Sequence, residues 1–184
     1  MGFFLVLVAI AVIIMLYLVG VYNKFVRKRS MMEEGWSGID VQLKKRHDLV
    51  PNLIETVKGY AKHEQETLNQ VIEARNSALQ ADGLQAQTQA ENQLNSALAN
   101  VFALSEAYPD LKANTNFIQL QQELTGIEGD IEKARRYYNA TVRENNIMVE
   151  SFPSNLVANA FHFELAEYFE LEDPGERAVP QVKF

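Results

Sequence analysis

The chain has 184 residues, with 24 acidic and 17 basic side chains, a net charge of −7 and no cysteine. This length suffices for one domain with a real hydrophobic core. The absence of cysteine excludes disulfides and thiolate metal sites, and the acidic balance disfavours binding to nucleic-acid phosphates.

Residues 2–22 form an uncharged apolar run. As an α-helix, such a run extends about 31 Å, which matches the hydrocarbon thickness of a bilayer. A cleaved signal peptide fits less well, because no basic residue precedes the run, the run exceeds about 15 residues and no small-x-small motif follows it. We therefore expect residues 1–22 to comprise a short external N-terminus and an uncleaved transmembrane helix.

The segment 23–38 is a basic juxtamembrane segment, and it contains Lys24, Arg27, Lys28 and Arg29. The positive-inside rule places such clusters on the cytoplasmic side of the membrane. We expect the N-terminus outside and the rest of the chain in the cytoplasm. The alternative is that these side chains contact lipid headgroups, which either side of the membrane would allow.

Apolar or small side chains recur at spacings of three and four over residues 39–78, which predicts a helical segment interrupted at His47. Pro51 lies inside it and predicts either a kink or a new N-terminal turn, because proline lacks an N–H. Gly35 and Gly38 precede this segment and predict a loosened junction with the membrane anchor.

Asp82 and Gly83 predict the end of that segment, and a second helix is expected over residues 84–107. Its first half is rich in Gln, Ala and Asn, so we expect residues 85–95 to be exposed or frayed. Pro109 ends the helix, since proline disfavours helical geometry in the residue before it.

The third helix, residues 114–151, carries the longest apolar seam. At 1.5 Å per residue it would measure about 57 Å, more than a compact globule needs. Asn145 on the seam is expected to fix helix pairing, and Pro153 separates a short helix at residues 155–161. The seam residues are Phe117, Leu120, Leu124, Ile127, Ile131, Ala134, Tyr138, Thr141, Asn145, Met148 and Phe152.

These patterns predict an all-α protein, in which the N-terminal transmembrane helix is followed by an elongated antiparallel helical bundle over residues 39–161. The bundle is expected to contain three long helices and the short C-terminal helix. Residues 162–184 form an aromatic C-terminal tail without helical periodicity. Water solvates a cluster of exposed aromatic groups poorly, so the tail is expected either to cover its own bundle or to pack on a neighbouring subunit. The candidate oligomer interface comprises Phe161, Phe163, Phe169, Val182 and Phe184.

Polar side chains gather around Pro51 and define a candidate docking face, which comprises Lys44, Arg46, Asp48 and Asn52. The alternative, which we favour, is a solvated helix surface with ion pairs such as Lys44 with Asp48, because these residues stand four apart.

No catalytic pattern stands out in the sequence. His63 and Glu64 begin a zinc-peptidase motif, but Thr67 occupies the position of its second histidine. No glycine-rich phosphate loop and no G-x-S-x-G elbow occurs. Three histidines without cysteine offer few metal ligands, so we expect solvated or hydrogen-bonded histidines, no cofactor and no enzymatic activity.

Several long motifs together resemble the LemA family. They are WSGIDVQLK from Trp36 to Lys44, RHDLVPNL from Arg46 to Leu53, YPDLKAN from Tyr108 to Asn114 and RYYNATV from Arg136 to Val142. The resemblance implies a bacterial inner-membrane protein with one span, an antiparallel helical bundle and no agreed enzymatic activity. Roles implied for the family lie in membrane organisation, envelope stress and magnetosome biogenesis.

The sequence thus favours a membrane-anchored helical scaffold that assembles with itself and organises membrane or envelope components. The alternative is an adaptor that regulates a membrane-bound protease or sensor kinase. The expected partners are the lipid bilayer, further copies of the chain or another membrane protein, and no nucleic acid.

Overall fold

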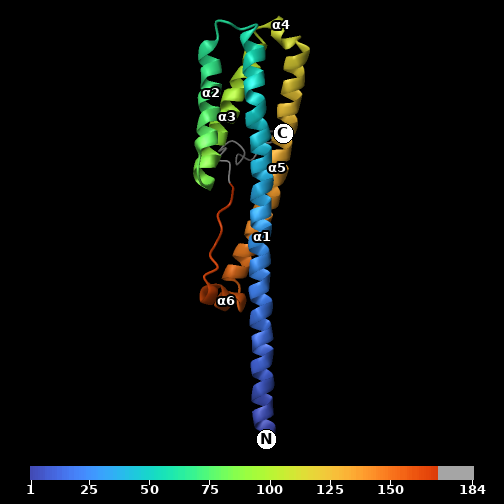
Figure 1. The fold of residues 1–184 in the computed structure, drawn as a ribbon, viewed down its shortest axis with the longest axis vertical. Coiled ribbons are helices and arrows are strands. Elements are labelled where there is room, and N and C mark those ends of the chain that lie inside the picture. Colours follow the sequence, from blue (N-terminus) through green and yellow to red (C-terminus); the bar gives the residue numbers. More distant parts are fainter. Residues whose placement is uncertain (170–184) are drawn as a thin grey trace, which may run out of the picture. The chain divides into compact units, whose positions relative to one another are not determined.

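The structure is a computed structural model of the chain, and it describes residues 1–169. Every regular element within these residues is an α-helix, which confirms the predicted all-α class (Figure 1). The elongated antiparallel arrangement of the whole bundle stays a prediction. The helices are α1 (Gly2–Lys58), α2 (Gln65–Gln80), α3 (Leu84–Ser105), α4 (Pro109–Lys112), α5 (Thr115–Glu150) and α6 (Ser154–Phe161).

The helices pack into two units. Unit 1 comprises residues 1–43 and 129–168, and unit 2 comprises residues 44–128 together with residue 169. The long helices α1 and α5 each contribute one part to either unit.

Helix α1 runs without interruption through Gly35, Gly38 and Pro51. The predicted loosening at the two glycines is therefore wrong, and no new helix begins at Pro51. Gly35 serves close packing instead, because a Cβ there would lie 3.2 Å from the Cα of Tyr138 on α5. A residue without a side chain allows the two helix backbones of unit 1 to approach at this point.

The turn at residues 59–64 separates α1 from α2. It was not predicted, because the spacing of apolar residues continues across it over residues 39–78. Ala61 is fully buried although it lies in the turn. Its N–H donates to the carbonyl of Val57 over 2.9 Å. The buried Ala61 therefore continues the spacing of apolar residues although it lies outside a helix. Gly59, a weak helix former, follows the last residue of α1.

In unit 2, α2 and α3 pack against each other as a helical hairpin. Gly83 in their connection has a φ of 83°, a backbone conformation that residues with a Cβ atom rarely adopt. The predicted end of the helical segment at Asp82 and Gly83 is therefore confirmed. The hairpin, α4 and the unit 2 parts of α1 and α5 enclose a hydrophobic core. Its fully buried side chains include Val50, Leu53, Val57, Val71, Leu94, Val101, Leu111 and Phe117.

Helix α4 was not predicted, because Pro109 was interpreted only as the end of the preceding helix. Pro109 stands at the start of α4, where its fixed φ suits the first helical turn and its missing N–H costs no hydrogen bond. Leu111 then reaches the core of unit 2.

The two C-terminal helices agree with the predicted ranges. Helix α5 is one residue shorter at each end than the predicted 114–151, and α6 begins one residue before the predicted 155–161. The seam of α5 is buried or half-buried as far as Met148. Phe152 lies beyond the end of α5 and is 79% exposed. In unit 1, Val157 and Ala158 of α6 are buried against α1 in a second small core.

Candidate functional site

The predicted docking face does not form a single exposed surface. Lys44, Asp48 and Asn52 are exposed, as expected. Arg46 is only 2% exposed, so its inclusion in an exposed face is wrong, and so is its inclusion in a solvated surface. The physical reason is that Arg46 lies on the core side of α1, where carboxylates from α3 and α5 neutralise its charge.

The side chains around Arg46 form the buried ionic cluster, which we define as Arg46, His47, Glu91, Asn95 and Glu128. The Arg46 guanidinium is paired with Glu91. Its Nη1 donates to Asn95 Oδ1 over 2.5 Å and to Glu128 Oε2 over 2.6 Å. His47 Nε2 lies 2.8 Å from Glu91 Oε1, and because a carboxylate only accepts, the histidine donates from Nε2.

Further hydrogen bonds fix this cluster. Gln87 Nε2 donates to Glu91 Oε1 over 2.9 Å, and Arg75 Nε donates to the backbone carbonyl of His47 over 2.8 Å. Burial raises the pKa of Glu91, but the hydrogen bond from His47 and the positive charge of Arg46 outweigh this effect and hold the pKa below its ordinary value. Glu91 is therefore a carboxylate at neutral pH.

The chemistry of the buried ionic cluster is structural. Glu91 accepts from Arg46, His47 and Gln87, so protein donors occupy the oxygens that a general base would need for a substrate. Within residues 1–169, no group of three or more His, Cys, Asp or Glu side chains converges closely enough to hold a metal ion. The cluster instead ties α1, α3 and α5 together inside unit 2.

Glu91 was not among the predicted site residues, because residues 85–95 were expected to be exposed or frayed. Glu91 is only 2% exposed, and Thr88 and Ala90 beside it are also buried. The apolar spacing offers one signal for the contact between His47 and Glu91. His47 stands between Leu43 and Val50 in the stripe of α1, where an apolar residue is expected, and Glu91 precedes Leu94 by three residues in α3.

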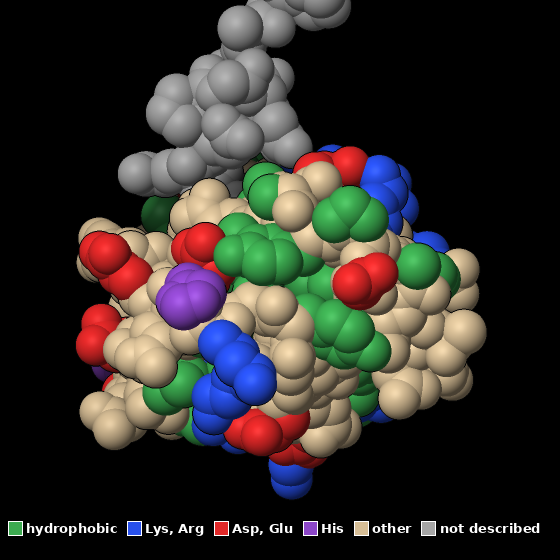
Figure 2. All heavy atoms as spheres, turned by 90° about the horizontal axis from the view of Figure 1, so that it is seen from above, with side chains coloured by type: hydrophobic (Ala, Val, Ile, Leu, Met, Phe, Trp, Pro, Cys, Tyr) green, Lys and Arg blue, Asp and Glu red, His purple; other side chains and the backbone are tan. Residues whose placement is uncertain are grey.

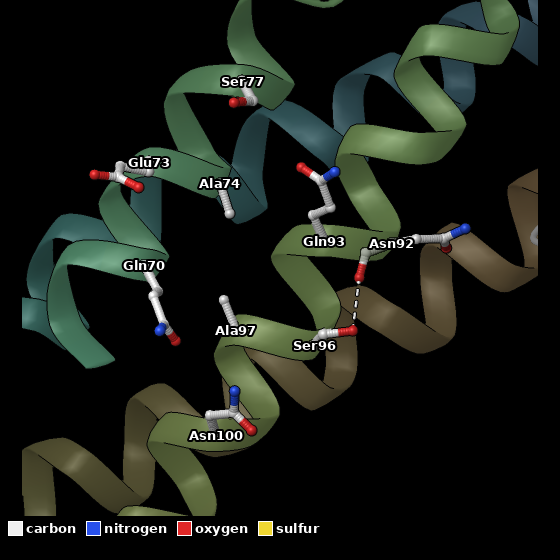
Figure 3. A pocket seen from close by; sticks show the side chains of 9 residues that line it. All are labelled: Gln70, Glu73, Ala74, Ser77, Asn92, Gln93, Ser96, Ala97 and Asn100. Atoms are coloured by element: carbon white, nitrogen blue, oxygen red, sulfur yellow. Dashed lines mark hydrogen bonds between the residues drawn. The ribbon is translucent and has the colours of Figure 1, made fainter. Parts of the chain in front are cut away.

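A second candidate is the open groove between α2 and α3, which has a volume of about 510 Å³ (Figure 3). Small and amide side chains from both helices line it, and Glu73 is the one charged residue among the nine. The Ser96 hydroxyl donates to the Asn92 carbonyl of its own helix over 3.0 Å, so it is not paired with a base. The groove has no arrangement that activates a nucleophile.

The end of unit 2 that carries the α1–α2 turn and α4 shows acidic, basic and hydrophobic side chains interspersed (Figure 2). At this end the Tyr108 hydroxyl donates to Glu64 Oε1 over 3.1 Å, and Asn114 donates to the Tyr60 hydroxyl over 2.9 Å. The hydrogen bond to Glu64 raises the pKa of Tyr108. Mixed charges provide no extended field of one sign that would attract an anionic or cationic partner.

The residues of the candidate oligomer interface differ in their exposure. Phe163 stacks on Phe25 of α1 with ring centroids 4.5 Å apart and is half-buried, whereas Phe169 is 1% exposed and has no free surface. Phe161 remains 55% exposed. Val182 and Phe184 lie outside the described residues.

The segment of residues 163–168 is held by polar side chains of α5. Asn146 forms a pair of hydrogen bonds with Ala166, each 2.9 Å long, in which its amide donates to the carbonyl and accepts from the N–H. Asn145 donates to the carbonyl of Glu164 over 3.2 Å, and the Tyr138 hydroxyl donates to that of Glu167 over 3.1 Å. The buried Asn145 thus binds the chain after α6, besides any role in helix pairing.

The first part of α1 is the most exposed apolar surface of the described chain. Side chains from Phe3 to Val19 are exposed almost without exception. By length and composition, α1 is the one helix among residues 1–169 that could cross a membrane. Water would solvate such a surface poorly.

Comparison with known proteins assigns a family to this architecture. The model of the LemA family matches residues 35–184. Protein LemA of Metamycoplasma hominis is 27% identical over 159 residues, which cover 85% of this chain and 73% of that protein. Magnetosome protein MamQ 2 of Paramagnetospirillum magneticum is 23% identical, and magnetosome protein MamQ of Magnetospirillum gryphiswaldense is 21% identical. Each alignment is 189 positions long, gaps included, and covers 88% of this chain and 70% of the relative.

Proposed function

The chain belongs to the LemA family, and from that premise we propose that it is a membrane-anchored helical scaffold that assembles with itself and organises membrane or envelope components. The observation that carries this proposal is the continuity of α1. Its exposed apolar part and the part that enters the core of unit 2 form one helix.

A single helix shared by anchor and body favours a mechanical role. A flexible linker would let the domain move freely relative to the membrane, whereas here no loop separates the apolar run from the part of α1 that enters the helical domain. Two relatives carry names that refer to a cell structure, the magnetosome, rather than to a reaction, which supports organisation over catalysis. In this proposal the protein has no enzymatic activity and needs no cofactor.

The proposed location is the bacterial inner membrane, with the N-terminus outside and the helical domain in the cytoplasm. Lys24, Arg27, Lys28 and Arg29 follow the apolar run directly, and the positive-inside rule favours this orientation. Self-assembly would use Val182 and Phe184 of the tail.

The size of the full-length protein in mild detergent tests the scaffold. We expect light scattering to report a uniform homo-oligomer. Truncation after Asp173, or Val182→Ala together with Phe184→Ala, is expected to reduce that size while helical content and membrane insertion are kept. A monomer that co-purifies with another membrane protein would contradict the scaffold and favour an adaptor for a protease or sensor kinase.

A further inference from the structure

We propose that α6 and its flanking residues are a second membrane contact, which lies in the headgroup region of the leaflet where the apolar part of α1 ends. We define this contact segment as residues 151–163. The proposal rests on the proposed function in one respect, since it requires the apolar part of α1 to be inserted in a bilayer.

Helix α6 lies beside α1 where the apolar run ends. Tyr22 is the last residue of the apolar run, and its ring lies 4.9 Å from that of Phe161 and 5.6 Å from that of Phe163. Val21 and Phe25 of α1 share a buried core with α6. In unit 1, α6 therefore packs on α1 at the level where the run ends (Figure 1), which is where an inserted helix leaves the hydrocarbon.

The composition of the contact segment suits the headgroup region. Residues 151–163 contain no Asp, Glu, Lys or Arg, although residues 31–184 as a whole hold 24 acidic and 13 basic side chains. Placing this segment among lipid headgroups therefore removes no formal charge from water. Glu150 and Glu164 lie just outside it, and both are exposed.

Large apolar side chains of the contact segment remain exposed. Phe152, Leu156 and Phe161 are 79%, 59% and 55% exposed, while Val157 and Ala158 of the same short helix are buried against α1. The helix thus carries large apolar side chains away from its own protein as well as toward it, beside the exposed but uncharged Asn159. An outward apolar surface of this kind is typical of helices that bury about 5–10 Å into the boundary between headgroups and acyl chains.

Continuity with the span identifies the lipid bilayer as the occupant. An open groove of about 220 Å³ joins α6 to α1, and it is lined by Leu18, Val19, Tyr22 and Phe161. Leu18 and Val19 belong to the apolar run itself, so the same acyl chains that surround the span reach this groove. The exposed Lys24 and Arg27 stand directly after the run, where they complement anionic headgroups.

Depth measurements on the full-length protein test the proposal. The chain lacks cysteine, so single cysteines can carry an environment-sensitive fluorophore after reconstitution in vesicles of phosphatidylcholine and phosphatidylglycerol. We choose Leu156→Cys for the contact segment, with Phe152→Cys as a second position in case the first disturbs α6. Val12→Cys reports on the span, and the exposed Glu132→Cys on α5 of unit 1 is the control in water.

We expect the label at Leu156 to be quenched by a nitroxide near the lipid headgroup and to lose most of the iodide quenching seen at Glu132. The label at Val12 is expected to be quenched best by a nitroxide deep in the acyl chains. Circular dichroism on each labelled protein verifies that helical content is kept, and the result at Phe152 is expected to match that at Leu156.

Three results would overturn the inference. Iodide access at Leu156 and Phe152 equal to that at Glu132, with Val12 still in lipid, would place α6 in water and leave the anchor intact. Protection from both iodide and lipid nitroxides would mean that protein, such as a second copy, covers α6. A label at Val12 that lipid nitroxides do not quench would refute the membrane anchor of the proposed function, and the inference would fall with it.

Discussion

At the scale of single residues, the buried ionic cluster is the most constrained part of unit 2. Arg46 and Glu91 are both 2% exposed, and each is costly to bury without a partner. Their pairing, with His47 and Glu128 beside them, offsets that cost and makes the relative positions of α1, α3 and α5 specific. A stable buried pair also explains why polar residues occupy core positions in both helices.

We expect Glu91→Ala to destabilise the protein by about 3 kcal/mol, because it leaves the charge of Arg46 buried with one carboxylate fewer and His47 without its acceptor. The matched control is Glu73→Ala on the exposed face of α2, which should change the free energy of unfolding by no more than about 0.5 kcal/mol. Urea unfolding followed by circular dichroism in detergent measures both. Equal effects would show that the cluster contributes no more than a surface carboxylate.

The depressed pKa of Glu91 predicts a loss of stability in acid. A carboxylate whose pKa is lowered by folding stabilises the folded state fully above the unfolded pKa, and this contribution is lost as pH falls through the folded pKa. We expect the urea midpoint to fall as pH drops below 4.5, the ordinary value for Glu91. Glu91→Gln should weaken this dependence. Parallel pH profiles for the wild type and Glu91→Gln would contradict the assignment.

At the scale of helices, two glycines three residues apart in α1 have opposite surroundings. A Cβ on Gly35 would lie 3.2 Å from the Cα of Tyr138 and 3.3 Å from the Tyr137 ring. A Cβ on Gly38 would meet nothing within 4 Å. One glycine is therefore required by helix packing in unit 1, whereas the other only weakens the helix.

We expect Gly38→Ala to stabilise the protein by about 0.5–1 kcal/mol, since alanine is a better helix former than glycine. Gly35→Ala should lose this gain, because the backbone of α5 must move away, and Gly35→Leu should be clearly destabilising. The melting temperatures of the three variants, followed by circular dichroism, provide the comparison. A Gly35→Ala protein as stable as Gly38→Ala would refute the close contact between α1 and α5.

The contact between α5 and the segment after α6 has its own test. The N–H of Ala166 donates to the amide oxygen of Asn146, so we expect it to exchange slowly with deuterium. Asn146→Ala should speed exchange at Ala166, because the N–H loses its acceptor, and Glu132→Ala should not. Hydrogen exchange monitored by mass spectrometry distinguishes them. Unchanged exchange in Asn146→Ala would mean that other contacts hold this segment.

At the scale of the whole molecule, the main open property is the side of the membrane on which the helical domain lies. The basic residues that follow the apolar run predict a cytoplasmic domain. We expect a C-terminal alkaline phosphatase fusion to be inactive and a C-terminal fluorescent protein to be fluorescent. Replacing Lys24, Arg27, Lys28 and Arg29 by asparagine should weaken this preference. An active phosphatase fusion of the unaltered chain would place the helical domain on the outer side.

The sequence by itself determined the elements whose physics is local. An uncharged run long enough to span a bilayer, the seam of α5 and the stop at Gly83 each follow from hydropathy, spacing or backbone geometry within one segment. The LemA resemblance was also confirmed, because its motifs are contiguous stretches of sequence.

Only the tertiary structure decided which polar residues are buried. Charge alone favours exposure, so Arg46 was assigned to a surface and the segment containing Glu91 to a frayed end. Burial became favourable only because partners 45 positions apart in the chain meet and neutralise each other. The same holds for Gly35, whose role depends on a helix about one hundred residues later. Pairings between distant segments leave no periodic trace in either segment, and for that reason they had to be seen in the fold.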